Sequence, residues 1–419
     1  MNRHHIGGAA LAAAALLSMT IAMPISAQAA KQPIKIGFSM ELSGPLASGG
    51  TTALRAMKIW EHDINAKGGL LGRRVKLVYY DDQSNPANVP GIYEKLIDVD
   101  KVNLLVSSYG TNLIAPAMPV AMEHNMVFMT LFGTAVNNKF HYGKYFQILP
   151  NGPQNERAVA QGWFDIAMSM NPKPKTVALV AADAEYAQNV IGGAREVVKK
   201  LPLKIVYDKS YPPSTVDYTP IIRAIAATHP DLIYAASYPH DTVGLIKAAH
   251  EVGLKTEMFG GGMIGLAFAP IDLALGPLMN GVTAFAVYVP AKTMQFPGIK
   301  SFLTRYRKIA GKADPLGFYL PPFAYAELQV LGDAVKGAGS LNQDKLAKYI
   351  HSHTFHTIVG KVTFAPDGEW TKTRALFVQY QGINNSGLKQ FQEPGHQVIL
   401  YPPKFVSGKL EYPYSTAAK

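Results

Sequence analysis

The sequence predicts an α/β protein made of two similar lobes, each with a parallel central sheet and Rossmann-like order. Strand-like apolar runs alternate with helix-like runs from Ile34 onward, at the interval expected of βαβ units rather than of a β-sandwich. The alternation restarts after Pro150. A chain of 419 residues also exceeds one usual hydrophobic core. Together these observations indicate two lobes.

The first thirty residues have the features of a secretory signal peptide. Basic and histidine residues at 3–5 precede an apolar run from Ile6 to Ile25, and 27–29 supply the small-x-small pattern that a signal peptidase cuts. Gly, Ser, Thr and Pro interrupt the run and no basic stop-transfer cluster follows, which argues against a membrane anchor. We therefore expect residues 1–29 to be removed on export to the periplasm.

A strand, a helix, a glycine turn and a second strand open the first lobe. The first strand is predicted at Ile34 to Met40, and a one-faced helix near 52–66 can end at Gly68-Gly69 with a left-handed cap. Val75 to Tyr80 alternates as a strand that runs back along the helix and delivers Asp81-Asp82 to its far end. Two further strands are expected at 103–107 and 126–130, with helices near 86–100 and 112–124.

The second half repeats this pattern and then returns to both lobes. Its strands are predicted at 176–181, 204–207, 232–235 and 281–287, and its helices near 154–170, 185–200, 217–227 and 241–252. The segment 298–350 is helical and has no strands of its own, so it should pack on the first lobe, with later strands returning to the second. The tail from Gly382, rich in Gly, Asn, Pro and Tyr, is expected to be irregular. The predicted lobes are 30–149 with 287–362, and 150–286 with 363–419.

Composition excludes several classes of protein and site. The chain has no cysteine, which excludes disulfides, thiolate metal sites, a cysteine nucleophile and a lipid-modified cysteine. The net charge is +11, yet basic residues never run longer than pairs, so a solvated basic surface is expected and not a nucleic-acid site. After the first thirty residues, no stretch approaches the roughly 20 apolar residues of a membrane span.

No motif indicates an enzyme, a cofactor or a metal. The chain contains no GxSxG, no HExxH and no Walker lysine motif. Gly260 to Gly265 matches GxGxxG, but the acidic Asp272 comes too early to meet a ribose. The histidines at 351, 353 and 356 fit neither one helix face nor a usual zinc spacing.

Two segments carry a resemblance to a known family. Leu42-Ser43-Gly44-Pro45, and the stretch from Asp63 to Asp82 with its Ile64-Asn-Ala-Lys-Gly-Gly-Leu-Leu-Gly72 core, resemble periplasmic solute-binding proteins of branched-chain amino acid ABC importers. The resemblance covers nearly the whole chain after the leader. It implies a monomer that binds ligand in a cleft between lobes, with hinge crossovers near 147–152, 281–287 and 362–365. It also implies an inner-membrane permease and its ATPase as partners.

In this family the first lobe holds the ligand carboxylate, which implies a role here for Tyr109-Gly110-Thr111 and Phe132-Gly133-Thr134. Both segments follow predicted strands, where ligands sit in open α/β sheets. Gly110-Thr111 also precedes a helix, so backbone N–H groups and the Thr111 hydroxyl can face an anion. Alternatively Thr111 only caps the helix, and Pro116 and Pro119 leave its start open.

The resemblance implies that the second lobe closes over the ligand with Tyr186 and Tyr238, and that Ser48 lies in the first cleft loop. Amino-acid binders place an acidic residue at the position of Gly262, in a predicted loop at 258–263 that has no carboxylate here. A buried ammonium left unpaired costs on the order of 3 to 5 kcal/mol. An α-amino acid ligand would therefore lose its usual partner.

These differences lead to two hypotheses for the ligand. Phe132 replaces a residue that is usually small, so the ligand is expected to be a small carboxylate with an apolar or aromatic body and no required ammonium. In the alternative, Asp183, Glu185 or Asp241 supplies the missing charge and the ligand is an amino acid. A free periplasmic protein that presents its ligand to a sensor is a third interpretation.

Overall fold

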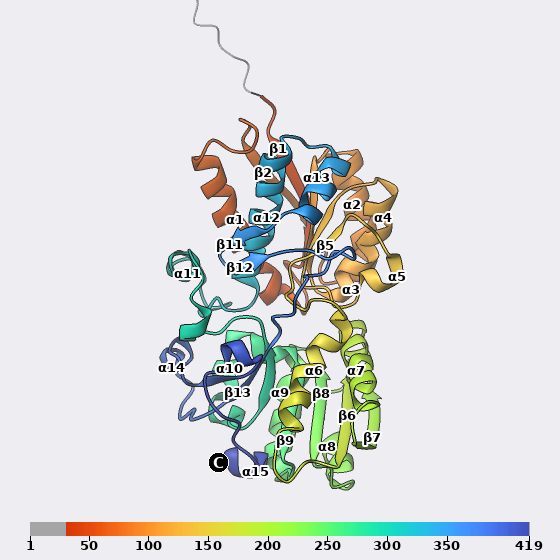
Figure 1. The fold of residues 1–419 in the computed structure, drawn as a ribbon, viewed down its shortest axis with the longest axis vertical. Coiled ribbons are helices and arrows are strands. Elements are labelled where there is room, and N and C mark those ends of the chain that lie inside the picture. The colour runs from red at the N-terminus through yellow and green to blue at the C-terminus, as the bar shows by residue number, and fades with distance from the viewer. Residues whose placement is uncertain (1–30, 419) are drawn as a thin grey trace, which may run out of the picture. The chain divides into compact units, whose positions relative to one another are not determined.

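The computed structural model describes residues 31–418, so the predicted leader at 1–29 lies outside the described residues. The predicted fold class is confirmed: two sheets, each dominated by parallel strands, form the framework of two lobes (Figure 1). In the part of the chain that the structure describes, no helix has the length and apolar character needed to cross a bilayer.

The first sheet is entirely parallel and has the strand order β2-β1-β3-β4-β5. This doubly wound order reverses direction between β1 and β3, and the crevice outside the carboxyl ends of such strands is where open α/β sheets bind ligands. Its strands are β1 (Ile34–Met40), β2 (Val75–Asp81), β3 (Leu104–Tyr109), β4 (Phe128–Leu131) and β5 (Tyr145–Gln147).

Helices from two distant parts of the chain pack around the first sheet and against one another. The early ones are α1 (Ala47–Ala66), η1 (Pro86–Asn88), α2 (Val89–Asp98), α3 (Thr111–Ile114), η2 (Ala115–Ala117), α4 (Met118–Glu123) and α5 (Asn137–Phe140). The late ones are α11 (Ile299–Arg307), α12 (Leu320–Ala338) and α13 (Gln343–Ser352), followed by the hairpin β11 (Phe355–Thr357) and β12 (Gly360–Val362).

The late helix α12 packs against the early helix α1 of the first lobe. Helices α1 and α12 lie together in Figure 1. A Cβ atom at Gly332 would lie 2.8 Å from the Trp60 ring, so the absence of a side chain there lets the two helices approach closely.

The second sheet has the order β14-β13-β10-β9-β8-β6-β7, in which the pairs β10–β13 and β13–β14 are antiparallel and all other pairs are parallel. Its order again reverses, between β6 and β8. The strands are β6 (Thr176–Ala182), β7 (Lys204–Tyr211), β8 (Leu232–Ser237), β9 (Met258–Met263), β10 (Thr283–Ala286), β13 (Leu376–Tyr380) and β14 (Gln397–Tyr401).

The helices of the second lobe surround this sheet, and the lower half of Figure 1 shows α6 to α9 around β6 to β9. They are α6 (Asn155–Ala167), α7 (Glu185–Val198), α8 (Thr219–Ala226), α9 (Pro239–Val252), η3 (Ile264–Ala267), α10 (Ala269–Leu275), η4 (Gly276–Met279), η5 (Lys292–Met294), α14 (Leu388–Gln392), η6 (Pro403–Phe405) and α15 (Tyr414–Ala417).

The motif that carries the family resemblance is a rigid corner. The Asn65 side chain accepts from Val75 N–H at 2.7 Å and donates to Val75 C=O at 2.9 Å, which ties the end of α1 to the start of β2. A Cβ atom at Gly69 would lie 1.9 Å from Arg73 O, and its φ is +76°, so only glycine fits this turn. Asp63 forms a bidentate ion pair with Arg305 of α11, with contacts of 2.6 and 2.8 Å. The motif therefore acts as scaffold.

Three predictions of local structure are wrong. The helix expected at 112–124 is broken into α3, η2 and α4, because Pro116 and Pro119 each remove a backbone donor. The loop expected at 258–263 is the buried strand β9. The tail after Gly382 is not wholly irregular, since it contains α14, β14 and α15.

Candidate ligand-binding pocket

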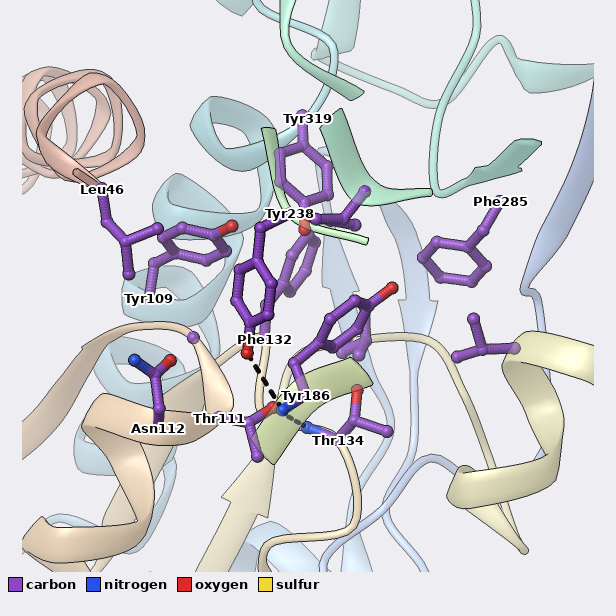
Figure 2. Close-up of a pocket in the computed structure, with 14 residues that line it drawn as sticks. Leu46, Tyr109, Thr111, Asn112, Phe132, Thr134, Tyr186, Tyr238, Phe285 and Tyr319 are labelled. Carbon is purple, nitrogen blue, oxygen red and sulfur yellow. Dashed lines mark hydrogen bonds between the residues drawn. The ribbon is translucent and has the colours of Figure 1, made fainter. Parts of the chain in front are cut away.

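A pocket lies where the carboxyl ends of strands from both sheets meet. Thr111 and Phe132 follow β3 and β4 of the first sheet, whereas Tyr186 and Tyr238 follow β6 and β8 of the second (Figure 2). The space at this site, including its opening to solvent, is ≈ 430 Å³. The lining residues are Leu46, Tyr109, Gly110, Thr111, Asn112, Phe132, Thr134, Leu149, Val159, Tyr186, Tyr238, Ile264, Phe285 and Tyr319.

Thr111 joins the two first-lobe segments of the pocket. Its Oγ1 accepts a hydrogen bond from the backbone N–H of Thr134 at 3.0 Å, drawn as a dashed line in Figure 2. Gly110, and not Thr111, occupies the N-cap position of α3, and no side chain caps this helix. The capping role considered for Thr111 is therefore wrong. Because α3 is a single turn, individual hydroxyl and N–H groups matter here more than a helix dipole.

Phe132 has a strained backbone that neighbouring groups hold in place. Its φ is +60°, a left-handed conformation that costs a bulky residue about 1–3 kcal/mol. The Gln147 side chain spans this bend: its Oε1 accepts from Phe132 N–H at 3.0 Å and its Nε2 donates to Gly133 O at 2.5 Å. The Phe132 ring packs against Tyr319 and Phe323, with ring centroids 5.1 and 5.0 Å away. The aromatic wall of the pocket is thereby fixed.

Tyr186 and Tyr238 form one aromatic unit in the second lobe. The Tyr238 hydroxyl accepts from Tyr186 N–H at 3.1 Å, and the Tyr186 hydroxyl donates to Gly262 O at 3.2 Å. The two rings meet edge to face with centroids 5.7 Å apart. This geometry fixes both rings beside the pocket, as Figure 2 shows.

Contacts also cross the pocket between the two lobes. Asn189, one helical turn after Tyr186 on α7, donates from Nδ2 to Thr134 O at 3.0 Å. Phe268, which precedes α10, packs edge to face against Tyr109 and Tyr319, with centroids 6.1 and 5.2 Å away. The lobes therefore enclose the pocket from both sides.

The pocket is uncharged. None of its lining residues is Asp, Glu, Lys, Arg or His. Burial raises the pKa of the Tyr109, Tyr186, Tyr238 and Tyr319 hydroxyls far above the physiological range, so these groups are neutral. Glu41, near Tyr109, is fully buried, and burial together with the nearby Asp82 raises its pKa well above its usual value. A ligand would meet hydroxyl and amide groups on an apolar surface.

Seven of the ten residues predicted for the site line this pocket: Tyr109, Gly110, Thr111, Phe132, Thr134, Tyr186 and Tyr238. The other three do not. Gly133 lies behind the wall, where a Cβ atom would meet Val136 at 2.9 Å. Ser48 lies in the first turn of α1 and donates to Ala313 O at 3.3 Å. Gly262 lies within β9 and contributes only its carbonyl, to Tyr186.

The three carboxylates considered as replacements for the acid at Gly262 also lie outside the lining. Asp241 is buried and accepts from the Tyr211 hydroxyl at 2.6 Å. Burial, only partly opposed by this hydrogen bond, raises the Asp241 pKa. Glu185 lies 3.8 Å from Lys139, and Asp183 is exposed. In residues 31–418 there is also no group of three or more His, Asp or Glu placed to hold a metal ion.

Several lining residues had no signal in the sequence. Tyr319 precedes the Pro321-Pro322 helix start, and Phe285 lies on β10, more than 100 residues from the first-lobe loops. Leu46 precedes α1, Leu149 follows β5, Val159 lies within α6 and Ile264 begins η3. Only tertiary packing brings these residues together.

Two sheets dominated by parallel strands, with a pocket between their strand ends, define a two-lobed ligand-binding protein. The chain belongs to the periplasmic binding protein family, whose sequence profile matches residues 33–386. This is a family of substrate-binding transport proteins and not of enzymes. The resemblance inferred from the sequence is thus confirmed.

Relatives and solved structures agree with this assignment. The Leu/Ile/Val-binding protein of Escherichia coli K12 is 23% identical over 359 residues, which cover 85% of this chain and 93% of the relative. The structure of a branched-chain amino acid transporter substrate-binding protein from Streptococcus pneumoniae, in complex with isoleucine, superposes with a TM-score of 0.71 at 20% identity, covering 88% of this chain and 100% of the other. A solute-binding protein from R. palustris, in complex with benzoate, gives 0.70 at 18% identity, covering 88% and 95%.

Proposed function

We propose that this protein is the extracytoplasmic solute-binding subunit of an ABC importer, and that its ligand is a small carboxylate with an apolar or aromatic body. The importer's permease and ATPase are the proposed partners of a monomeric binding protein, which residues 1–29 direct to the periplasm. The observation that carries the ligand class is the pocket lining, which combines aromatic rings with hydroxyl and N–H groups and contains no charged side chain.

The proposed carboxylate site is the start of α3 and the bend after β4. The Thr111 hydroxyl accepts from Thr134 N–H and keeps its own hydrogen to donate. The backbone N–H groups of Thr111 and Asn112 are the first two of α3, and they precede the Leu113 and Ile114 N–H groups, which donate to Gly110 O. These donors can hold a carboxylate without a basic side chain.

The proposed ligand body lies between the aromatic residues of the two lobes. Phe132 and Tyr319 would cover one side, and Tyr186 and Tyr238 the other. An ammonium in this enclosed space would have no carboxylate, at a cost on the order of 3 to 5 kcal/mol. The R. palustris protein of the same fold was solved with benzoate, so this fold can hold an aryl acid.

The proposed lobes are residues 30–149 with 287–362, and residues 150–286 with 363–419. We propose that the pocket opens and closes by bending at the three crossovers between these lobes, near 147–152, 281–287 and 362–365. The space between the lining side chains is narrow, so ligand entry requires the Tyr186 and Tyr238 side to move away from Thr111. A few backbone torsions at such crossovers suffice for a hinge motion.

The decisive experiment compares ligands that differ only in the ammonium group. Ligand-free, refolded protein is titrated calorimetrically with leucine and 4-methylpentanoate, and with phenylalanine and 3-phenylpropanoate; benzoate, a hydroxycinnamate and a dicarboxylate complete the set. A ligand at 100 times its dissociation constant adds about 2.7 kcal/mol to the free energy of unfolding. We expect the acids without an ammonium to bind more tightly. Tight binding of leucine with no binding of the acids would overturn the proposed ligand class in favour of an amino acid, the class named for several relatives.

A further inference from the structure

A second concave site, separate from the pocket, is strongly basic. This groove has a volume of ≈ 1720 Å³ including its open mouth, and it shares no lining residue with the pocket. Lys361, Lys372, Lys404 and Arg374 line it, and none of its lining residues is Asp or Glu. The three lysines are exposed, whereas Arg374 is only 8% exposed. The groove thus combines an exposed cationic rim with a buried cation.

Arg374 is a buried charge without a counter-ion. Its guanidinium lies between the rings of Phe296 and Trp370, 4.7 and 4.9 Å from their centroids. Nη1 donates to Val359 O, but Nε and Nη2 have no acceptor among the described residues. Burial lowers the pKa of this guanidinium to about 9, and no carboxylate of residues 31–418 opposes the shift.

Trp370 adds a third unsatisfied donor beside Arg374. It is 4% exposed, it lines the same groove, and its Nε1–H has no acceptor in the part of the chain that the structure describes. Buried polar groups without partners are rare in folded proteins, and each costs free energy. All three unsatisfied atoms are donors, so the missing partner is an acceptor, and the charge of Arg374 requires a negative one.

We propose that the groove binds a small multivalent anion, with phosphate or carboxylate groups that accept from Arg374 and Trp370 while the lysines neutralise the remaining charge. Arg presents a planar set of donors suited to two oxygens of one such group. Thr357, Thr371 and Thr373 also line the groove and bring hydroxyl groups to the same place. The site does not depend on the identity of the pocket ligand.

The groove lies between two segments of the chain that a bound anion would connect. Lys361 belongs to the β11–β12 hairpin beside α12, whereas Lys372 and Arg374 belong to the segment that enters β13 of the second sheet. An anion bound to both would hold these segments together.

Calorimetric titration with sodium pyrophosphate and with citrate tests the proposal, using the full chain at pH 7.5 and an ionic strength held constant with NaCl. Wild-type protein should bind pyrophosphate or citrate saturably at one site and unfold at a higher temperature in its presence. The double variant Lys361→Gln/Lys372→Gln should bind at least about 10-fold more weakly, since each lost charge contributes to an anion's affinity. Lys200→Gln, which changes another exposed lysine, two residues after the end of α7, is the control and should bind as wild type does.

Arg374→Gln separates the buried charge from the rim. This variant should lose the anion-dependent rise in unfolding temperature while unfolding no earlier than wild type without the anion, because it removes an uncompensated charge. If this variant does not fold, the lysine variant decides. Equal responses of wild type and the groove variants, or a response that NaCl alone reproduces, would overturn the proposal. Binding of hexaglutamate without binding of pyrophosphate or citrate would overturn it too, and would assign the groove to an acidic protein segment.

Discussion

The hydroxyl oxygen of Thr111 accepts a hydrogen bond from the backbone N–H of Thr134 at 3.0 Å, although the two residues follow different strands. This bond holds the bend after β4 against the start of α3, and both residues are buried. It gives Thr111 two functions in the proposed site, since the hydroxyl organises the second loop and still has a hydrogen to donate to a ligand.

Replacing Thr111 should weaken ligand binding without preventing the protein from folding. We expect Thr111→Ala to bind the cognate carboxylate about 10- to 100-fold more weakly, the range for losing one or two hydrogen bonds to a charged group. Thr111→Ser keeps the hydroxyl and should stay within a few-fold of wild type. Calorimetry measures affinity, and circular dichroism should show both variants folded. Unchanged affinity in Thr111→Ala would remove this residue from the site.

Asn189 provides a hydrogen bond that crosses between the lobes, from its side chain to Thr134 O. Asn189→Ala should speed ligand dissociation by about 3- to 10-fold. The substitution removes a hydrogen bond worth about 1 kcal/mol that holds the two lobes together around the ligand. Association should change little. Stopped-flow fluorescence measures both rates.

Gln188→Ala is the matched control for this variant. Gln188 is the preceding residue on α7, and it donates to Ala182 O and Ser210 Oγ within the second lobe. If Gln188→Ala speeds dissociation as much as Asn189→Ala does, the contact between the lobes is not the cause.

Sequence patterns sufficed for the parts of the fold that depend on local periodicity. The motif from Asp63 to Asp82 predicted helix, turn and strand, because its function is local: Asn65 pairs with Val75 ten residues away. The pocket residues predicted after β3 and β4 agree with the rule that such strand ends face ligands, whereas those after β6 and β8 were implied by the family resemblance. Neither inference required long-range packing.

The sequence could not predict features that depend on distant segments. The family resemblance implies a loop at 258–263, and three consecutive glycines give no strand signal that would correct it, yet the segment is the strand β9. In the structure its glycines make room for larger neighbours, since a Cβ atom at Gly261 would lie 2.4 Å from the Tyr234 ring. Tyr319 entered the pocket from a helix start more than 180 residues after Phe132. These contacts are properties of packing and leave no periodic signal.

Substitutions at Gly262 test whether an acidic residue at this position would create an amino-acid site. A Cβ atom there would lie 2.7 Å from Val190 Cγ1 and 3.2 Å from the Tyr234 hydroxyl. We expect Gly262→Ala to lower the free energy of unfolding by about 1–3 kcal/mol through overpacking, and Gly262→Asp to lower it further without gaining leucine binding. Urea denaturation and calorimetry check both.

Gly192 on α7 serves as the control for Gly262, because no atom lies within 4 Å of an added Cβ. Gly192→Ala should be neutral or stabilising by up to about 1 kcal/mol, as expected for alanine in a helix. A Gly262→Asp variant that is as stable as wild type and binds leucine would contradict the packing found at β9.

Asp314 should give the protein a specific pH dependence of stability. Burial raises its pKa to about 6, although the N–H groups of Gly317 and Leu316 and the nearby Arg307 oppose the shift. Because the folded-state pKa lies above the unfolded value, the proton binds more tightly to the folded state. Its stabilising contribution is therefore complete below about pH 4 and is lost as the pH rises through 6.

Asp314→Asn removes this titration and keeps an oxygen that can accept from Leu316 and Gly317. The variant and wild type should have similar free energies of unfolding near pH 4, and the variant should be more stable by about 1–3 kcal/mol at pH 8, since one pKa unit corresponds to 1.36 kcal/mol. Because asparagine also loses the attraction between the Asp314 carboxylate and Arg307, we expect the gain in the free energy of unfolding to lie toward the lower end of this range. Urea denaturation from pH 4 to pH 8 measures the difference between the two proteins, in which the contributions of the other carboxyl groups cancel.

Asp217, an exposed residue that accepts from Thr219 N–H, is the control, and Asp217→Asn should follow the wild-type profile. A constant difference between Asp314→Asn and wild type across this range would show that Asp314 does not titrate there.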